Sequence, residues 1–344
     1  MPTALGIGAK TRQNDLDVAF QFSLFTGVNA RSGDNLNTDA ATSNGGLGYS
    51  SLNIRQSYLS FGDKSWGTIL LGRNLGVFGS DAILSDMTLL GVGSNGGATG
   101  SSTLGRIGSG YTYADWLAQI TYTTPNMSGF EASASVHEVL GSINNANLGA
   151  SAKASYSFAA NDVTGKIWVG GTHKKIQTSD FAAGAGTMAL ATAATRVYRE
   201  EDSNGAELGA KLGFAGAELV GYYYSGKNLD AGNGTAINTL AAPTAVNQGN
   251  NNQGGYVQAT YVLPFKTKIG ASWGTSIVKM GHGDLRDAER EAWIVGAYHP
   301  LTKHLNLVAE YNHLDVTSAD NNGVGVASPE GKAKTASLGA ILFF

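Results

Sequence analysis

Apolar and polar side chains alternate along the whole length of this chain. About fifteen segments of roughly 9 to 12 residues place Val, Ile, Leu, Ala, Phe or Tyr at every second position. Examples are VAFQFSLF (18–25), KASYSF (153–158) and LNLVAEYN (305–312). Successive side chains of a strand point to opposite faces, so each segment predicts a β-strand with one apolar and one polar face.

The connections between these segments alternate strictly between short and long. The short ones cover 12–15, 62–65, 125–129, 160–162, 215–216, 264–265 and 300–303. The long ones are polar and rich in Gly, Asn and Asp, and cover 28–50, 75–115, 140–148, 177–203, 227–253, 278–287 and 316–333. This rhythm is typical of an antiparallel outer-membrane barrel, with tight periplasmic turns and longer external loops.

The length of the segments also fits a membrane sheet. A tilted strand of about 9–11 residues crosses the hydrocarbon layer, whereas a membrane helix needs about 18 consecutive apolar residues, and the sequence contains no such run. A soluble β-sandwich also alternates, but its strands usually have about 5–6 residues. Aromatic residues near the segment ends predict interfacial girdles: Trp66, Tyr122, Phe130, Phe158, Phe214, Tyr261, Phe265, Trp293, Tyr298 and Phe344.

Composition excludes several other classes of protein. Charged residues make up 14% of the chain and the net charge is −3, which gives no case for a nucleic-acid partner. Cysteine is absent, so disulfides and thiolate metal sites are excluded. Gly91, Gly93 and Gly96 match a dinucleotide-binding pattern, but no helical pattern follows them. The six histidines lack metal-ligand spacing. We therefore expect no enzyme, no metal site and no cofactor.

The two ends of the chain indicate whether the number of strands is even or odd. Residues 1–13 contain no basic region followed by an apolar stretch, so they predict no signal peptide. Single-chain bacterial barrels have an even number of strands. The first segment runs into a short turn and the last ends on Phe344 after a long loop, so both point to the periplasm. We expect one barrel domain over 1–344, with the signal peptide and an outward-running first strand absent.

Three stretches of sequence carry a resemblance to a known family. Residues 54–87 read IRQSYLSFGDKSWGTILLGRNLGVFGSDAILSDM, residues 120–136 read ITYTTPNMSGFEASASV, and the chain ends in LGAILFF. In this order and spacing they resemble the trimeric general porins of Gram-negative bacteria. The resemblance covers nearly the whole chain.

The resemblance implies an all-β transmembrane barrel of 16 strands, of which about 15 are present. It implies that the long third loop, which is the connection over 75–115 once the absent first strand is counted, folds into the lumen and narrows a water-filled channel. The implied function is passive diffusion of small hydrophilic solutes and ions through the outer membrane. The implied partners are two further copies in a homotrimer, outer-membrane lipid and lipopolysaccharide, and the barrel-assembly machinery, which reads Phe344.

The family places acids of the folded loop opposite basic residues of the wall. Arg55 matches a wall arginine and Asp86 matches a loop acid, with Asp81 as a second acid and Arg106 as a substitute for missing wall arginines. Such opposed charges create a field across the constriction. The alternative for Arg55 is an interstrand salt bridge, and for Asp86 it is a turn or helix cap. Arg73 matches a position buried near the subunit interface.

Alternation assigns further charges to the lumen. Lys153, Lys166, Lys211 and Lys268 are opposed in sign by Glu131, Glu207 and Glu310, so no ion preference follows from the sequence. A sugar-selective channel would show an aromatic track in the lumen, and Trp168 alone does not make one. The alternatives to general diffusion are a substrate- or anion-selective porin, a non-conducting surface adhesin barrel, and an enzyme at the barrel rim.

Overall fold

The computed structural model describes residues 3–26, 52–92, 105–139, 147–181, 196–229, 249–279, 287–317 and 330–344. These residues form a 15-stranded sheet and one short helix. In chain order the elements are β1 Thr3–Gln13, β2 Leu16–Thr26, β3 Leu52–Asp63, β4 Gly67–Leu75, α1 Ser80–Ser85, β5 Trp116–Thr123, β6 Phe130–His137, β7 Gly149–Ala160, β8 Val163–Phe181, β9 Arg196–Phe214, β10 Ala217–Lys227, β11 Asn251–Val262, β12 Lys268–Lys279, β13 Ala288–Pro300, β14 Leu305–Thr317 and β15 Glu330–Leu342.

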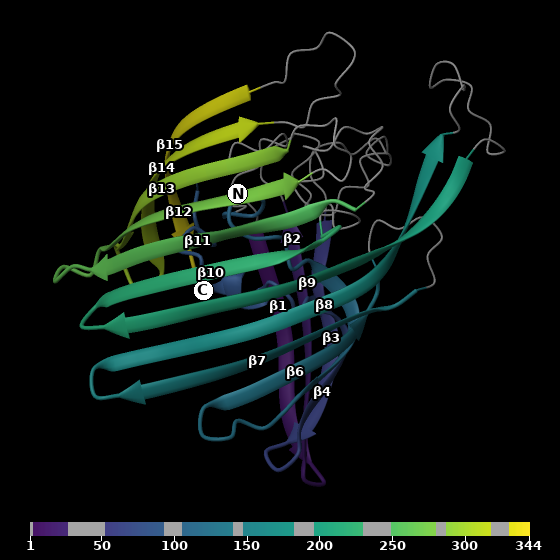
Figure 1. Cartoon of the computed structure of the whole chain (residues 1–344). Coiled ribbons are helices and arrows are strands. Elements are labelled where there is room, and N and C mark those ends of the chain that lie inside the picture. The colour runs from purple at the N-terminus through teal and green to yellow at the C-terminus, as the bar shows by residue number, and fades with distance from the viewer. Residues whose placement is uncertain are drawn as a thin grey trace.

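Each strand pairs antiparallel with its neighbours in sequence, so the spatial order equals the chain order. The sheet curls into an open barrel wall with the tight turns gathered at one end (Figure 1). β1 and β15 are the two edges of this sheet, and both run toward the end that carries the tight turns. The all-β antiparallel prediction and the count of about fifteen strands are confirmed.

Two of the tight turns place both of their central residues in the left-handed region of the backbone. Asn14 and Asp15 join β1 to β2 with φ values of 48° and 65°. Ala215 and Gly216 join β9 to β10 with φ values of 48° and 85°. Two-residue hairpins whose central residues both have positive φ match the twist of the flanking strands, and Asn, Asp and Gly adopt this conformation at low cost.

The two faces of the sheet differ as the alternation predicts. On β9, Leu208, Leu212 and Phe214 are exposed on the outer face, whereas Glu207 on the inner face is buried. An apolar outer surface is stable only against lipid. Tyr298, predicted for an aromatic girdle, instead faces inward and donates a hydrogen bond to Glu310 Oε1 at 2.7 Å. Residues that lie an even number of positions apart on a strand share one face, so Tyr298 is on the same face of β13 as the buried Arg290 and Ile294.

Two boundaries differ from the sequence-based prediction. A long connection was predicted over 177–203, but β8 continues to Phe181 and β9 begins at Arg196, so each strand has 19 residues. Most residues of these strand extensions are polar, so the extensions show no apolar/polar alternation from which a strand could be predicted. The strands remain paired there from Gln177 to Phe181, because backbone pairing needs no particular side chain.

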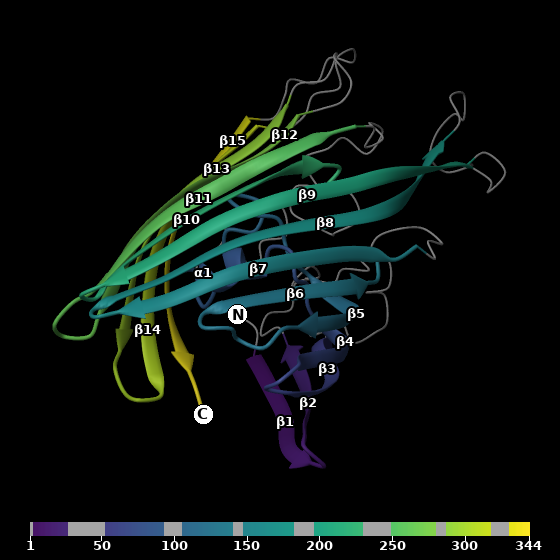
Figure 2. The same cartoon turned by 60° about the horizontal axis from the view of Figure 1, so that its bottom comes forward.

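The connection from β4 to β5 enters the concave side of the sheet, where α1 lies (Figure 2). Its backbone or side chains bond to β7, β8, β9, β11, β12, β13 and β14. The prediction of a third loop folded into the lumen is confirmed. Over the described ranges, no helix is long and apolar enough to cross a membrane.

A charge on the outer face tests the assignment of that face to lipid. Leu208 is 60% exposed near the middle of β9, so Leu208→Arg should lower the free energy of unfolding by about 2–4 kcal/mol. Gln21→Arg, on the inner face of β2, is the matched control and should cost little, because lumen water solvates the charge. Urea unfolding in lipid vesicles measures both. Equal losses for the two variants would contradict the assignment.

Candidate functional site

The site is built on residues 76–92 and 105–115, which leave and rejoin the wall at one place. Gly76 N–H donates to Asp115 C=O at 2.8 Å and closes the root of this loop. Gly79 then turns the chain with a φ of 80°, a conformation that favours glycine, and α1 begins at Ser80. The root lies between β4 and β5, so the loop must cross the lumen to reach any other strand.

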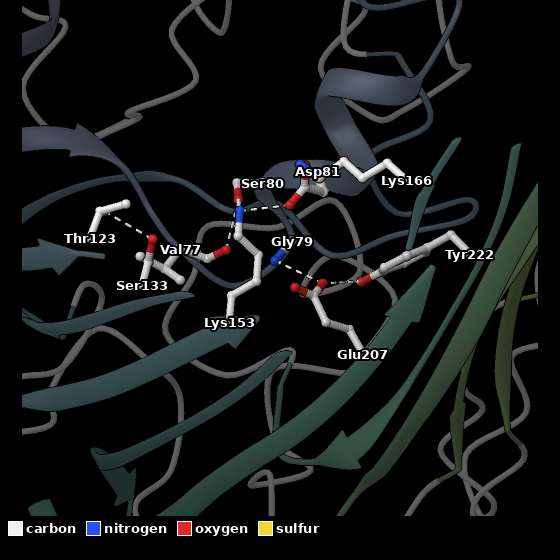
Figure 3. Close-up of polar contacts among 10 residues, drawn as sticks. All are labelled: Val77, Gly79, Ser80, Asp81, Thr123, Ser133, Lys153, Lys166, Glu207 and Tyr222. Atoms are coloured by element: carbon white, nitrogen blue, oxygen red, sulfur yellow. Dashed lines mark hydrogen bonds and ion pairs between the residues drawn. The ribbon is translucent and has the colours of Figure 1, made fainter. Parts of the chain in front are cut away.

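Glu207 on β9 holds the start of α1. Its Oε2 accepts hydrogen bonds from Gly79 N–H at 2.9 Å and from the Tyr222 hydroxyl at 2.8 Å (Figure 3). A side chain on the neighbouring Gly170 would meet Glu207 Oε1 at 2.7 Å, so the glycine leaves the space that this carboxylate occupies. Hydrogen bonds to a carboxylate are about twice as strong as those between neutral groups.

β11 holds the remainder of α1. The Tyr256 hydroxyl donates to Ala82 C=O at 2.8 Å. The Gln258 side chain donates to Ser85 C=O at 2.9 Å and accepts from Met87 N–H at 2.8 Å. Carbonyls at a helix end have no partner within the helix, so these wall side chains supply the bonds that α1 lacks.

An aromatic cluster fills the space between the loop and the wall. Trp168 and Tyr222 lie 6.4 Å apart between ring centroids, Tyr222 and Tyr256 5.9 Å, and Tyr256 and Tyr111 of the loop 5.8 Å. Each of these four side chains is at most 5% exposed. Trp168 therefore does have aromatic neighbours, but they form a small core beneath the loop instead of a track along which a solute moves.

Arg106 anchors the returning half of the loop. Its Nε donates to Ser272 Oγ at 2.6 Å, and its Nη2 donates to Ser272 C=O at 3.0 Å and Ala292 C=O at 2.5 Å. Its Nη1 donates to Ser109 C=O within the loop. The side chain is fully buried, and burial lowers the pKa of the guanidinium. The structure thus uses Arg106 to bind the loop to β12 and β13.

Asp86 is engaged within the loop itself. Its Oδ2 accepts from Arg106 N–H at 2.9 Å and the Tyr111 hydroxyl at 2.7 Å. Its Oδ1 accepts from the N–H and the hydroxyl of Thr88. The structure therefore places this carboxylate where it joins the two halves of the loop. Val92 N–H extends the contacts to β14 by donating to Glu310 Oε2 at 2.9 Å.

Asp81, in the first turn of α1, meets two lysines of the wall. Lys153 Nζ on β7 lies 2.6 Å from Asp81 Oδ2 and donates to Ser80 Oγ at 2.8 Å, and Lys166 Nζ on β8 donates to Asp81 Oδ1 (Figure 3). Burial opposes ionisation of Asp81, but the two ammonium groups outweigh burial and lower the pKa of this carboxyl. The structure thus brings together three of the predicted site residues.

Arg55 occupies a bulge of β3. Gln56 pairs with Ser23 and Ile54 with Leu24, which leaves Arg55 as the extra residue. Its guanidinium carbon lies 4.1 Å from the centroid of the Phe25 ring and 5.9 Å from that of Trp116, which follows the loop root. The structure therefore places Arg55 against aromatic rings beside the loop root.

The other predicted residues lie elsewhere on the wall. Lys211 on β9 pairs with Glu218 at 2.8 Å, and Glu131 lies half-buried on β6. Arg73 on β4 donates to Ile54 C=O at 3.3 Å and lies 3.8 Å from Glu138. The sequence analysis did not predict that Glu207 and Tyr222 hold the start of α1. The sequence signal for this contact is the pair Gly170 and Gly209, because these small residues leave space for the side chains of Glu207 and Trp168.

Comparison with known proteins agrees with this geometry. The model of the Gram-negative porin family matches residues 3–319. The chain belongs to that family. It is accordingly an outer-membrane β-barrel of the channel-forming class. No protein with a curated description matches the sequence significantly. Among the described residues, no group of three or more His, Cys, Asp or Glu side chains could hold a metal ion.

Solved porin structures share the fold. OmpF of Salmonella typhi, in complex with daunomycin, matches with a TM-score of 0.62 and 16% identity, over 98% of this chain and 89% of that one. The outer-membrane channel DcaP of Acinetobacter baumannii gives 0.60 and 13%, over 99% and 85%. The anion-selective porin of Comamonas acidovorans gives 0.56 and 14%, over 99% and 88%. At these identities the likeness concerns the fold.

The loop root supplies a pH-dependent prediction. Burial raises the pKa of the Asp115 carboxyl to about 6, whereas in an unfolded chain an aspartate titrates near about 3.9. Ionised Asp115 therefore destabilises the fold above pH 6, and the penalty fades as pH falls toward about 4. Asn tolerates the φ of 60° found here and can still accept the bond from Trp116 N–H.

Asp115→Asn should therefore stabilise the protein by up to about 3 kcal/mol at pH 8 and by almost nothing near pH 4. Urea unfolding of variant and wild type at both pH values measures the difference. A stability gain that is the same at both pH values would contradict the account.

Proposed function

We propose that the protein is a general diffusion porin, which lets small hydrophilic solutes and ions pass through a constriction between its third loop and its wall. The observation that carries this proposal is the meeting of Asp81 on the loop with Lys153 and Lys166 on the wall. The lysine side chains keep 17% and 33% of their surface exposed, so they contact lumen water. Polar side chains at the narrowest region favour hydrated solutes over bulky apolar ones.

The opposed charges also set a field across the lumen. Low-dielectric walls focus the field of such groups, and ions respond to it when they pass within about 8 Å, the screening length at physiological salt. Arg55 and Glu131 on other parts of the wall would add to this field. Asp86 and Arg106 would act indirectly, by fixing the loop at the depth where Asp81 reaches its lysines.

We further propose that the protein works as a homotrimer in a bilayer of lipid and lipopolysaccharide. Arg73 lies on β4, and its contacts with Ile54 and Glu138 would brace a surface that faces a neighbouring subunit. Phe344 is fully exposed at the C-terminus, where the barrel-assembly machinery could bind it.

Planar-bilayer recording on refolded protein tests the proposal. Ohmic conductance that closes in three equal steps is expected, and liposome swelling should admit small neutral sugars and exclude large ones. Silent bilayers with correctly folded protein would overturn the channel assignment and favour an adhesin barrel. A single closing step per insertion would contradict the proposed homotrimer and leave the channel function standing.

Substitution of the loop acid tests the constriction. Asp81→Asn removes the charge that neutralises Lys153 and Lys166, so the permeability ratio of chloride to potassium should rise, by about threefold. Reversal potentials in a KCl gradient measure this ratio. Ser80→Ala is the control, because it removes the hydrogen bond from Lys153 without changing any charge. If the permeability ratio were unchanged in Asp81→Asn, the proposal that Asp81 acts on ions at the constriction would be wrong.

A further inference from the structure

The third loop turns two leucines toward the water of the lumen. Of the loop residues that the structure describes, 76–92 and 105–115, Leu84 and Leu90 are the only two that are exposed, with 61% and 58% of their surface accessible. The loop lies on the concave side of the sheet (Figure 2), so these side chains meet lumen water and not lipid.

This arrangement is the reverse of what solvation by water favours. The charged side chains of the loop, Asp81, Asp86 and Arg106, are all buried. Burial of a charge and exposure of an apolar side chain to water both cost free energy. The loop buries other apolar side chains, so the fold alone gives no reason for the two leucines to face water. Exposed apolar surface of this kind is typical of ligand-binding grooves.

Both leucines stand on backbone that the wall holds in place. Gln258 binds the backbone directly after Leu84, through its hydrogen bonds at the end of α1. Two residues after Leu90, Val92 N–H donates to Glu310 Oε2 at 2.9 Å. A fixed apolar surface loses little conformational freedom when a ligand binds, so more of the contact energy is available for binding.

Leu84 borders a hollow below the loop. The hollow has a volume of 480 Å³, within the range of about 300–1,000 Å³ that is usual for small-molecule sites. Thr164 on β8 and Thr260 on β11 also line it, and both side chains are on the inner face of the wall. A solute in the hollow therefore meets an apolar side chain on the loop and hydroxyl groups on the wall.

The charges around the hollow are paired or opposed. Lys211 Nζ lies 2.8 Å from Glu218 Oε2, and Lys268 is opposed in sign by Asp162. Asp86 also lines the hollow, but both of its oxygens accept hydrogen bonds within the loop. The hollow thus has little to select an ion of either sign, and its apolar surface remains to distinguish one uncharged solute from another.

The two strands that lead into the loop carry apolar groups on the same side of the sheet. Tyr58 on β3 pairs with the inward-facing Gln21. Leu70 on β4 lies two residues from Gly72, which pairs with Tyr58, so Leu70 shares this inner face. Both side chains are half-buried. Apolar groups therefore occur on the inside of the wall as well as on the loop.

We propose that Leu84 and Leu90 form an apolar contact surface that binds the apolar group of a small uncharged solute on its way through the channel. The solute class is a polar molecule with one apolar substituent, such as an aryl glycoside. The sugar hydroxyls stay hydrated or bind the wall, while the substituent covers a leucine and removes apolar surface from water. This inference rests on the proposed channel function and names a class of solute that the channel favours among uncharged solutes.

Interruption of the ion current by solute in planar bilayers tests the inference. Phenyl β-glucoside and methyl β-glucoside share their sugar and differ in the apolar group, and current noise gives the dissociation constant of each. The wild type should bind phenyl β-glucoside more tightly, by about threefold or more. Leu84→Asn and Leu90→Asn keep the branched shape of the side chain and should each weaken binding of phenyl β-glucoside by about threefold, with methyl β-glucoside unchanged.

Leu301→Asn is the matched control. Leu301 is 54% exposed in the tight turn between β13 and β14, so the same substitution there should change neither dissociation constant. The heat-dependent shift in gel mobility reports whether each variant folds, and the comparison of the two glucosides in the wild type needs no variant.

A conducting wild type that binds the two glucosides equally would overturn this inference and leave the channel function standing. The same holds if binding of phenyl β-glucoside is unchanged in both folded leucine variants, or if binding of both glucosides weakens equally. Folded wild-type protein that does not conduct would overturn the inference and the channel function together.

Discussion

Every backbone N–H and C=O group within the membrane needs a hydrogen-bond partner, and the arrangement of the strands follows from this requirement. Lipid offers none, so the strands pair in sequence order and curl into a wall. Once the strands are paired, alternate side chains must face lipid, and the others are left for the interior. Within the membrane, the inner face of the described strands is therefore where a polar site can form, and the long third loop brings further polar partners to it.

The loop is held on that inner face by contacts of two kinds. Glu207, Gln258 and Arg106 use charged or amide groups to satisfy backbone atoms that would otherwise lack partners. The rings of Trp168 and Tyr256 fill the space beneath the loop and exclude water from these bonds. Hydrogen bonds in such a dry region are stronger than in water. Asp81 is consequently presented to its two lysines at a fixed depth in the barrel.

Much of this fold follows from sequence alone. Alternation and connection length predicted the strands, the tight turns and the inward position of Lys153, Lys166 and Lys211. The pattern could not predict the 19-residue lengths of β8 and β9, because polar strand extensions pair through their backbone. The pattern also could not place Arg55, because a bulge residue interrupts the alternation of side-chain directions. Nor could it reveal that the charged groups of Arg106 and Asp86 make hydrogen bonds that fix the loop. Those roles depend on contacts between distant strands.

Cysteine cross-linking can show whether the third loop crosses the lumen and is held against the inner face of the wall, because the chain has no native cysteine. A Cβ atom at Gly339 on the inner face of β15 would lie 3.0 Å from Val92 Cβ of the loop, close to the separation in a disulfide, which is about 3.5–4.5 Å. Val92→Cys with Gly339→Cys should form a reducible cross-link in nearly all folded protein, and Val92→Cys with Leu338→Cys, whose side chain faces outward, should form none. Equal cross-linking of the two pairs, or none in either, would contradict the account.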